Sequence, residues 1–177
     1  MRPASLRRPA RLLRGIHLLE LLAVLMLLAV LLALAWGPWQ RALRYLQADA
    51  LRSELVSSLV LARNTAIAQH RRISVCASAA GEGCGTDWEV GWQVQLEART
   101  PATGEPPRVL RRYTPRHAHV RLLTSTHRPQ VQFRSDGRNA GTNQTLRLCV
   151  DGYEHSRVVI SVPGRIRSLR PRTPQRC

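Results

Sequence analysis

The longest apolar run of the chain carries no charged residue from position 21 to position 39. A helix of about 20 apolar residues can cross the hydrocarbon core of a bilayer, so the run predicts a membrane-spanning helix. Residues 1–15 contain no acid but several arginines: Arg2, Arg7, Arg8, Arg11 and Arg14. Because basic flanking residues stay in the cytoplasm, this pattern predicts export of everything that follows the run.

A second helical pattern follows the apolar run. Pro38 comes directly after Gly37, and a proline inside a helix kinks or ends it. From there to about residue 70, apolar residues recur three and four positions apart, which predicts an amphipathic helix that continues the membrane helix. The expected inner face consists of Leu43, Leu46, Ala50, Leu55, Leu59, Ala62 and Ala66. The other faces carry arginines that we expect in solvent: Arg41, Arg44, Arg52 and Arg63.

Beyond residue 70, apolar positions alternate with polar ones, which is the period of a half-buried strand. Such segments occur at residues 73–75, 92–96, 131–133, 146–150 and 158–162. Turn-forming residues separate them, and Asp151-Gly152 is typical of a tight turn between two strands. We therefore expect an α+β fold. One long N-terminal helix, half membrane-spanning and half amphipathic, would pack on an antiparallel β-sheet.

The charge balance narrows the range of partners. All 27 basic residues are arginine, they outnumber the 11 acids, and the formal net charge is +16. Such an excess indicates a polyanion, an acidic membrane surface or an acidic neighbouring protein as partner. Arginine suits phosphate because its planar guanidinium group can donate to two oxygens at once.

The arginine excess is greatest at the C-terminus, where no acid follows Glu154. Arg165 and Arg167 are two positions apart, so they share one face if the segment is extended. Gly164 would allow the backbone to come close to a phosphate. The candidate contacts to nucleic acid are therefore Gly164, Arg165, Arg167, Arg170 and Arg172. A solvated basic tail, or a contact with acidic subunits, is the alternative.

The chain has four cysteines, all after the apolar run: Cys76, Cys84, Cys149 and Cys177. An even number in an exported domain predicts two disulfides, for which three connectivities are possible. The local choice joins Cys76 to Cys84 across a glycine-rich loop, and Cys149 would then join Cys177. A zinc site is the alternative, although the sequence has no Cys-x-x-Cys spacing.

The sequence contains no pattern that predicts catalysis. The six histidines are scattered, and His117 and His119 lack neighbouring ligands of other types that a metal site would use. No Gly-x-Ser-x-Gly segment occurs, and the glycines at 81, 83 and 85 lack the helix that follows a phosphate-binding loop. We therefore expect the chain to be no enzyme and to hold no metal and no cofactor.

A lone carboxylate, Glu20, stands at the head of the apolar run, five residues after Gly15. An acid inside a membrane is costly, so Glu20 is a functional candidate. With the basic residues before them, Gly15 and Glu20 resemble the class III leader of type IV pilin-like proteins. The resemblance implies that a prepilin peptidase cuts after Gly15 and that Ile16 becomes the methylated first residue. It also implies that Glu20 pairs with a subunit's N-terminal amine during assembly. Ile16 and His17 stand where the family usually has Phe and Thr.

Further motifs resemble the FimT/GspH group of minor pilins and pseudopilins. They are Cys76, Cys84, Trp-Glu-Val-Gly-Trp at 88–92, Phe-Arg-Ser-Asp-Gly at 133–137, and Gly-Arg-Ile-Arg at 164–167. The resemblance implies a leader peptide at 1–15, a transmembrane and assembly helix at 16–38, and a periplasmic pilin-like domain at 39–177. It also implies three partners: other pilin or pseudopilin subunits, the prepilin peptidase and the inner membrane. The Gly-Arg-x-Arg motif of the FimT branch is associated with DNA contact in natural transformation, which adds DNA as a fourth.

Other interpretations of the N-terminus stay open. A secretory signal could be cut after Ala33-Leu34-Ala35, the apolar run could be an uncut anchor, and Arg7-Arg8 could belong to a twin-arginine export signal. The function has alternatives as well. The chain could be a type IV minor pilin that binds DNA non-specifically for uptake, a structural pseudopilin of a type II secretion system, or a minor pilin that primes assembly without binding DNA.

Overall fold

The computed structural model describes residues 18–79, 83–98, 106–114, 119–124 and 129–177 of the 177-residue chain. The chain divides into two compact units, Met1–Gln40 and Arg41–Cys177. Helix α1 (Leu18–Gln69) contributes residues to both units. The leader expected at 1–15 lies outside the described residues.

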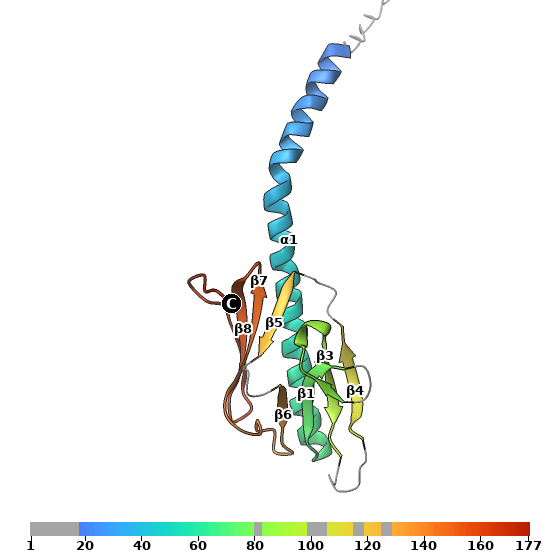
Figure 1. Ribbon diagram of the computed structural model, residues 1–177, viewed down its shortest axis with the longest axis vertical. Helices are drawn as coiled ribbons and strands as arrows, with labels where there is room; N and C mark the ends of the chain where they lie inside the picture. The colour runs from blue at the N-terminus through green and yellow to red at the C-terminus, as the bar shows by residue number, and fades with distance from the viewer. Residues whose placement is uncertain (1–17, 80–82, 99–105, 115–118, 125–128) are drawn as a thin grey trace, which may run out of the picture. The chain divides into compact units, whose positions relative to one another are not determined.

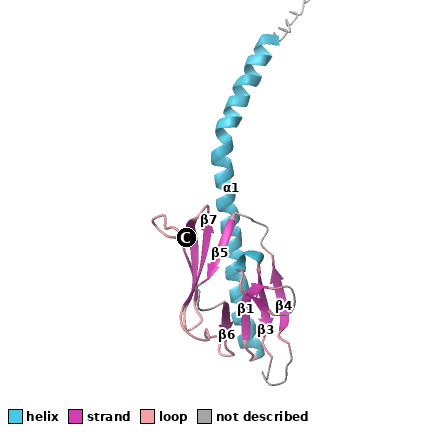
Figure 2. Ribbon diagram, in the orientation of Figure 1, coloured by secondary structure: helices cyan, strands magenta, loops and turns pink. Residues whose placement is uncertain are grey.

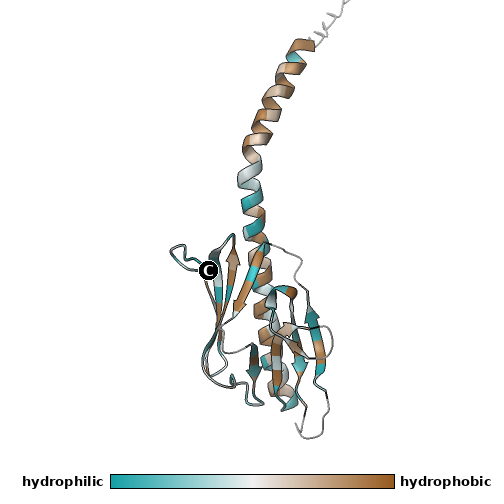
Figure 3. Ribbon diagram, viewed as in Figure 1, coloured by the Kyte–Doolittle hydropathy of each residue, from teal (hydrophilic) through white to brown (hydrophobic). Residues whose placement is uncertain are grey.

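The described residues of the first unit, 18–40, are helical throughout. Figure 3 colours most of this stretch as hydrophobic, and its large apolar side chains are exposed. The helix is long and apolar enough to cross a membrane. Pro38 does not end it, because α1 continues to Gln69. A proline removes a single backbone N–H donor from the helix ladder, and the ladder resumes beyond it.

The second unit contains residues 41–69 of α1 and two antiparallel sheets (Figures 1 and 2). The first sheet has the order β2 (Cys84–Gly85), β1 (Ile73–Ser78), β3 (Trp92–Leu96) and β4 (Arg108–Tyr113), and β6 (Gln130–Phe133) also pairs with β1. The second sheet has the order β5 (Val120–Thr124), β7 (Gln144–Val150), β8 (Tyr153–Ile160) and β9 (Ile166–Leu169). A 3-10 turn, η1 (Trp88–Val90), leads into β3. The predicted α+β fold, with one long helix on antiparallel sheet, is confirmed.

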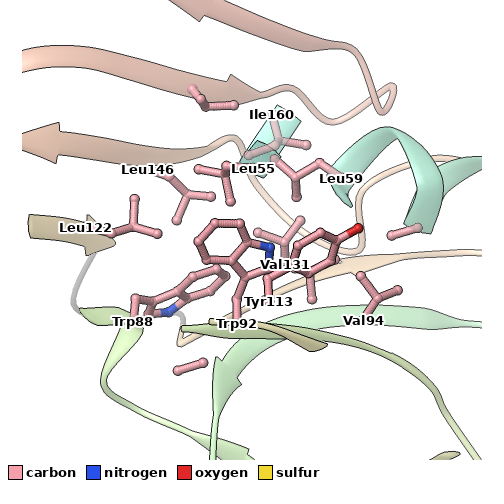
Figure 4. Close-up of a cluster of buried hydrophobic side chains, with 14 of the residues drawn as sticks. Leu55, Leu59, Trp88, Trp92, Val94, Tyr113, Leu122, Val131, Leu146 and Ile160 are labelled. Carbon is pink, nitrogen blue, oxygen red and sulfur yellow. The ribbon is translucent and has the colours of Figure 1, made fainter. Parts of the chain in front are cut away.

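The core lies where α1 meets both sheets, as Figure 4 shows. Leu55 and Leu59 of α1 are fully buried, and each such side chain contributes about 1.5–3 kcal/mol. The Trp92 ring stacks on Tyr113 with centroids 5.4 Å apart, and its Nε1 donates to Ser58 Oγ at 2.8 Å. A buried indole N–H needs such an acceptor. The tryptophan motif therefore serves the core, as its apolar character suggests.

The inner face of α1 is partly as predicted. Burial of Leu55, Leu59, Ala62 and Ala66 is confirmed. The expected inner positions Leu43, Leu46 and Ala50 are wrong, because all three are exposed. The buried stripe continues towards the N-terminus through Leu51 and Ala48 instead. Ala48 and Leu51 keep the three- and four-residue spacing to Leu55, so one straight stripe forms and the other three residues lie off it.

Three of the four helix arginines expected in solvent have partners. Arg44 Nη1 lies 2.8 Å from Asp151 Oδ1, Arg52 lies 3.4 Å from Asp49, and Arg63 Nε donates to the Gly137 carbonyl at 3.0 Å. The three side chains are half-buried, so the expectation holds only in part. Arg44 reaches the β7–β8 turn and Arg63 reaches the loop after β6, whereas the acidic partner of Arg52 lies on α1 itself. Arg41 is exposed, as expected.

Candidate nucleic-acid interface

The candidate basic residues lie in or after the C-terminal hairpin, which consists of β8, the turn at residues 161–165 and β9. Gly164 N donates to Ser161 O at 2.8 Å, and Ser161 N donates to Arg165 O at 3.0 Å. Gly164 has a φ of 81°, in the left-handed region that favours glycine. These contacts form a three-residue hairpin loop that ends in a left-handed residue. The loop brings Arg165 to the start of β9.

Gly164 is buried rather than open to a ligand. A Cβ at this position would overlap with the carbonyl oxygen of Gly137 and lie 3.0 Å from Arg63 Nε. The fold itself therefore requires a glycine at this position, whether or not a phosphate approaches it. It allows the hairpin loop to pack against the loop after β6.

Arg165 and Arg167 lie on the outer side of the second sheet. Ile166 pairs with the fully buried Ile160 and packs against the core, while Arg167 pairs with Val159. Since side chains alternate along a strand, the residues that flank Ile166 face outwards. Both arginines are exposed, and no acid among the described residues contacts either guanidinium group. The two charges are therefore available to a partner.

Two further arginines on the same outer face are occupied. Arg147 and Arg157 are paired residues of β7 and β8, and their Nε atoms lie 3.0 Å and 2.5 Å from the two carboxylate oxygens of Glu154. The Glu154 side chain is only 1% exposed. A carboxylate so buried needs charged partners, so these arginines stabilise the sheet. Arg157 also donates to Gln175 Oε1, and Arg147 donates to the Arg176 carbonyl.

The other two predicted contacts lie beyond β9. Arg170 Nη2 lies 2.5 Å from Asp49 Oδ2 on α1, and His155 Nε2 lies 3.0 Å from Asp49 Oδ1. Burial raises the pKa of Asp49, but hydrogen bonds from His155 and Arg170 lower it further, so the pKa lies below its usual value. Arg170 is thus engaged within the domain. Arg172 is exposed and lines an open hollow of ≈ 700 Å³ together with Arg170 and Arg41.

The two disulfides have the local connectivity described in the sequence analysis. Cys76 of β1 is bonded to Cys84 of β2, and Cys149 of β7 is bonded to Cys177. The second bond fixes the C-terminal segment beside the C-terminal hairpin, where Glu154 N also donates to Gln175 O at 2.8 Å. The basic end of the chain is therefore part of the folded domain.

The membrane-side candidates lie elsewhere in the chain. Gly15 and Ile16 are outside the described residues. Glu20 lies in the first turn of α1 and is exposed. Among the residues that the structure describes, no group of three or more His, Cys, Asp or Glu side chains could hold a metal ion.

Comparison with known proteins gives a consistent family and fold. Residues 40–164 match a protein family described as type II transport protein GspH. A type IV minor pilin FimU of Pseudomonas aeruginosa has a similar structure, with a TM-score of 0.58 and 23% identity over 77% of this chain and 95% of that one. The minor pseudopilin EpsH from the type 2 secretion system of Vibrio cholerae has a TM-score of 0.54 and 16% identity over 72% and 99%. A search of curated protein sequences found no match.

Proposed function

The chain belongs to the GspH family of type II transport proteins, and from this membership we propose that it is a minor pilin whose C-terminal hairpin binds DNA without sequence preference. The observation that carries the proposal is the exposure of Arg165 and Arg167 on the outer side of β9, without an acidic partner among the described residues. The proposed role is DNA uptake in natural transformation.

The chemistry of this surface suits a phosphate backbone. A guanidinium group donates in a planar fork to two phosphate oxygens, and such contacts position nucleic acid without reading its bases. The segment after Glu154 has no acid, so nothing within it repels phosphate. Binding by these contacts falls steeply as salt rises, because each neutralised phosphate releases counterions.

The membrane-side part of the proposal concerns the first helix. We propose that cleavage follows Gly15, that Ile16 is the methylated N-terminus of the mature chain, and that residues 16–38 span the inner membrane, with residues 39–177 in the periplasm. Glu20 would then pair with a subunit's N-terminal amine, which offsets the cost of a carboxylate among apolar helices. The apolar, exposed helix of the first unit supports this arrangement.

The test is the fluorescence anisotropy of a labelled DNA duplex, titrated with the full chain in non-ionic detergent at several salt concentrations. About four phosphate contacts would give a log–log slope near −3.6, at roughly −0.9 for each contact on duplex DNA. We expect Arg165→Gln with Arg167→Gln to flatten this slope by about 1.8 on duplexes of any sequence. Absence of binding by the wild-type chain at low salt would refute the proposal.

A structural pseudopilin of a type II secretion system is the second candidate, favoured because the matched family is one of type II transport proteins. In that case the exposed arginines would contact acidic neighbouring subunits. Deletion of the gene would then impair protein secretion rather than DNA uptake. A strain that loses secretion but takes up DNA normally would decide for this candidate.

A further inference from the structure

We propose that Arg138, on the loop after β6, contacts the sugar–phosphate backbone together with Arg165 and Arg167. The inference rests on the proposed function, since it extends the same DNA-binding site to a second loop. We call the surface formed by Arg134, Arg138, Arg165 and Arg167 the paired-turn surface.

Two loops of this domain have the same local geometry. In the loop at residues 134–138, Gly137 N donates to Arg134 O at 2.8 Å, and Arg134 N donates to Arg138 O at 2.9 Å. The loop at residues 161–165 has the same two hydrogen bonds at the same positions. Gly137 has a φ of 77°, close to the 81° of Gly164. Each loop therefore ends in a left-handed glycine followed by an arginine, Arg138 in one and Arg165 in the other.

The two loops are joined to each other. Gly164 packs against the Gly137 carbonyl, and Asn139 N donates to Val162 O at 3.0 Å. Arg63 of α1 donates from Nε to the same Gly137 carbonyl at 3.0 Å. These contacts hold the backbones of Arg138 and Arg165 as neighbours. The two side chains therefore start from one rigid frame.

The charge of the paired-turn surface is unbalanced. All four of its arginines are exposed, and within the described part of the chain their guanidinium groups have no hydrogen bond or ion pair. Asp136 is the single acid of the two loops, and its Oδ1 accepts a hydrogen bond from Arg138 N at 3.0 Å. Asp136 thereby stabilises the turn and leaves an excess of three positive charges.

A phosphate backbone fits this arrangement because it offers a regular row of equal negative charges. Arginines on two fixed neighbouring loops can each neutralise a separate phosphate of one nucleic-acid strand. The two loops together would cover a longer stretch of that strand than the hairpin alone. Such contacts add affinity without adding sequence preference. The site is then a surface across two sheets rather than one arginine motif, since β6 belongs to the first sheet and β9 to the second.

The test compares single substitutions by anisotropy of a labelled duplex, with the full chain in non-ionic detergent. Arg138→Gln should flatten the log–log salt slope by about 0.9, so that its loss of affinity between 50 and 200 mM salt is about 3.5-fold smaller than that of the wild type. Arg165→Gln should flatten the slope by a similar amount. Arg138→Lys keeps the charge and should therefore keep most of the wild-type slope. Thermal unfolding of each variant checks that the fold is unchanged.

Arg108→Gln is the matched control. Arg108 is exposed at the start of β4, far along the first sheet from β6, and the substitution changes the net charge equally. We expect the salt slope of Arg108→Gln to equal that of the wild type. If Arg108→Gln and Arg138→Gln flatten the slope equally, general charge explains binding, and the proposal is wrong.

Two more outcomes separate this inference from the proposed function. If Arg165→Gln flattens the slope and Arg138→Gln does not, the inference is overturned while DNA binding stands. If the wild-type chain does not bind the duplex, both are overturned. If labelled poly-glutamate binds as tightly as DNA, with the same dependence on Arg138, the surface recognises an acidic protein, which also overturns the inference.

Discussion

Gly164 packs directly on the carbonyl group of Gly137, so that the two left-handed glycines of the domain's paired loops share one contact. A Cβ on Gly164 would overlap with that backbone carbonyl, whereas a Cβ on Gly137 would meet the end of the Ile67 side chain of α1 at 2.6 Å. The contact ties the C-terminal hairpin to the loop after β6 and to the end of the helix. It explains why a glycine precedes Arg165.

Gly164→Ala should destabilise the domain more than Gly152→Ala. Both glycines have a φ of 81°, but a Cβ on Gly152 meets nothing within 4 Å. Each alanine carries a backbone cost of about 1–2 kcal/mol, and the overlap at Gly164 adds about 1–3 kcal/mol. Urea denaturation of both variants measures the difference. Equal losses would show that the contact with Gly137 relaxes without cost.

The bond between Cys149 and Cys177 should contribute more stability than the bond between Cys76 and Cys84. The sequence separations are 28 and 8 residues, and in the chain-entropy account a longer loop gains more, within a typical range of about 2–4 kcal/mol. Denaturation of the two double Cys→Ser variants compares the losses. Peptide mapping without reductant checks the pairing, and free thiols at all four positions would contradict it.

Asp49 should stabilise the domain at neutral pH and lose this effect in acid. Its pKa is raised by burial but lowered further by His155 and Arg170, so it lies below the ordinary value of 3.8. A lowered folded-state pKa gives stability that is present above the unfolded-state value and disappears as pH falls through the folded-state value. We expect Asp49→Asn to unfold at lower urea concentration than the wild type near neutral pH, with the gap closing below pH ~4. A gap that stays constant to low pH would contradict this role.

The N-terminus of the protein extracted from membranes should be Ile16. The expected mass is that of a chain cut after Gly15 with one added methyl group, and N-terminal mass spectrometry measures it. Because the chain has no lysine, amine-directed reagents label only the N-terminus, which simplifies the assignment. A chain that begins at Trp36 would instead support an ordinary secretory signal.

Glu20→Gln should allow cleavage but reduce incorporation into filaments. Glutamine keeps the shape of the side chain and loses the charge that would pair with a subunit's N-terminal amine. Glu20→Asp keeps the carboxylate and should retain more incorporation. Immunoblots of sheared filaments and of membranes compare the variants. If the wild type, Glu20→Gln and Glu20→Asp are incorporated equally, the charge of Glu20 is not needed for assembly.

The apolar alternation of the sequence was sufficient to predict the central strands. In β7 and β8 every second residue from Leu146 and Val158 is buried, so the pattern is visible without a structure. Two edge strands, β4 and β9, were missed because they bury little. β4 places Val109 and Leu110 next to each other among arginines, and β9 buries only part of Ile166. These two strands therefore leave no clear period in the sequence.

The partners of charged side chains could not be predicted from the sequence. Asp49 and Arg170 are 121 positions apart, and only the docking of the C-terminal segment on α1 brings them together. For the same reason the candidate list held Arg170, which is engaged, and omitted Arg138, which is exposed. A signal for Arg138 does exist in the chain. Asp136-Gly137-Arg138 and Pro163-Gly164-Arg165 are both turn residues followed by Gly-Arg, and comparing them would have suggested two similar loops.

The position of β9 at the edge of its sheet also affects solubility. An edge strand exposes unpaired backbone N–H and C=O groups, which can pair with the edge of another molecule and start aggregation. β9 is only four residues long and carries Arg167 on its outer side, and both features discourage such pairing. The arginines proposed to hold DNA would thus also keep neighbouring domains apart at high local concentration. Selection for solubility alone would therefore favour charge on this strand.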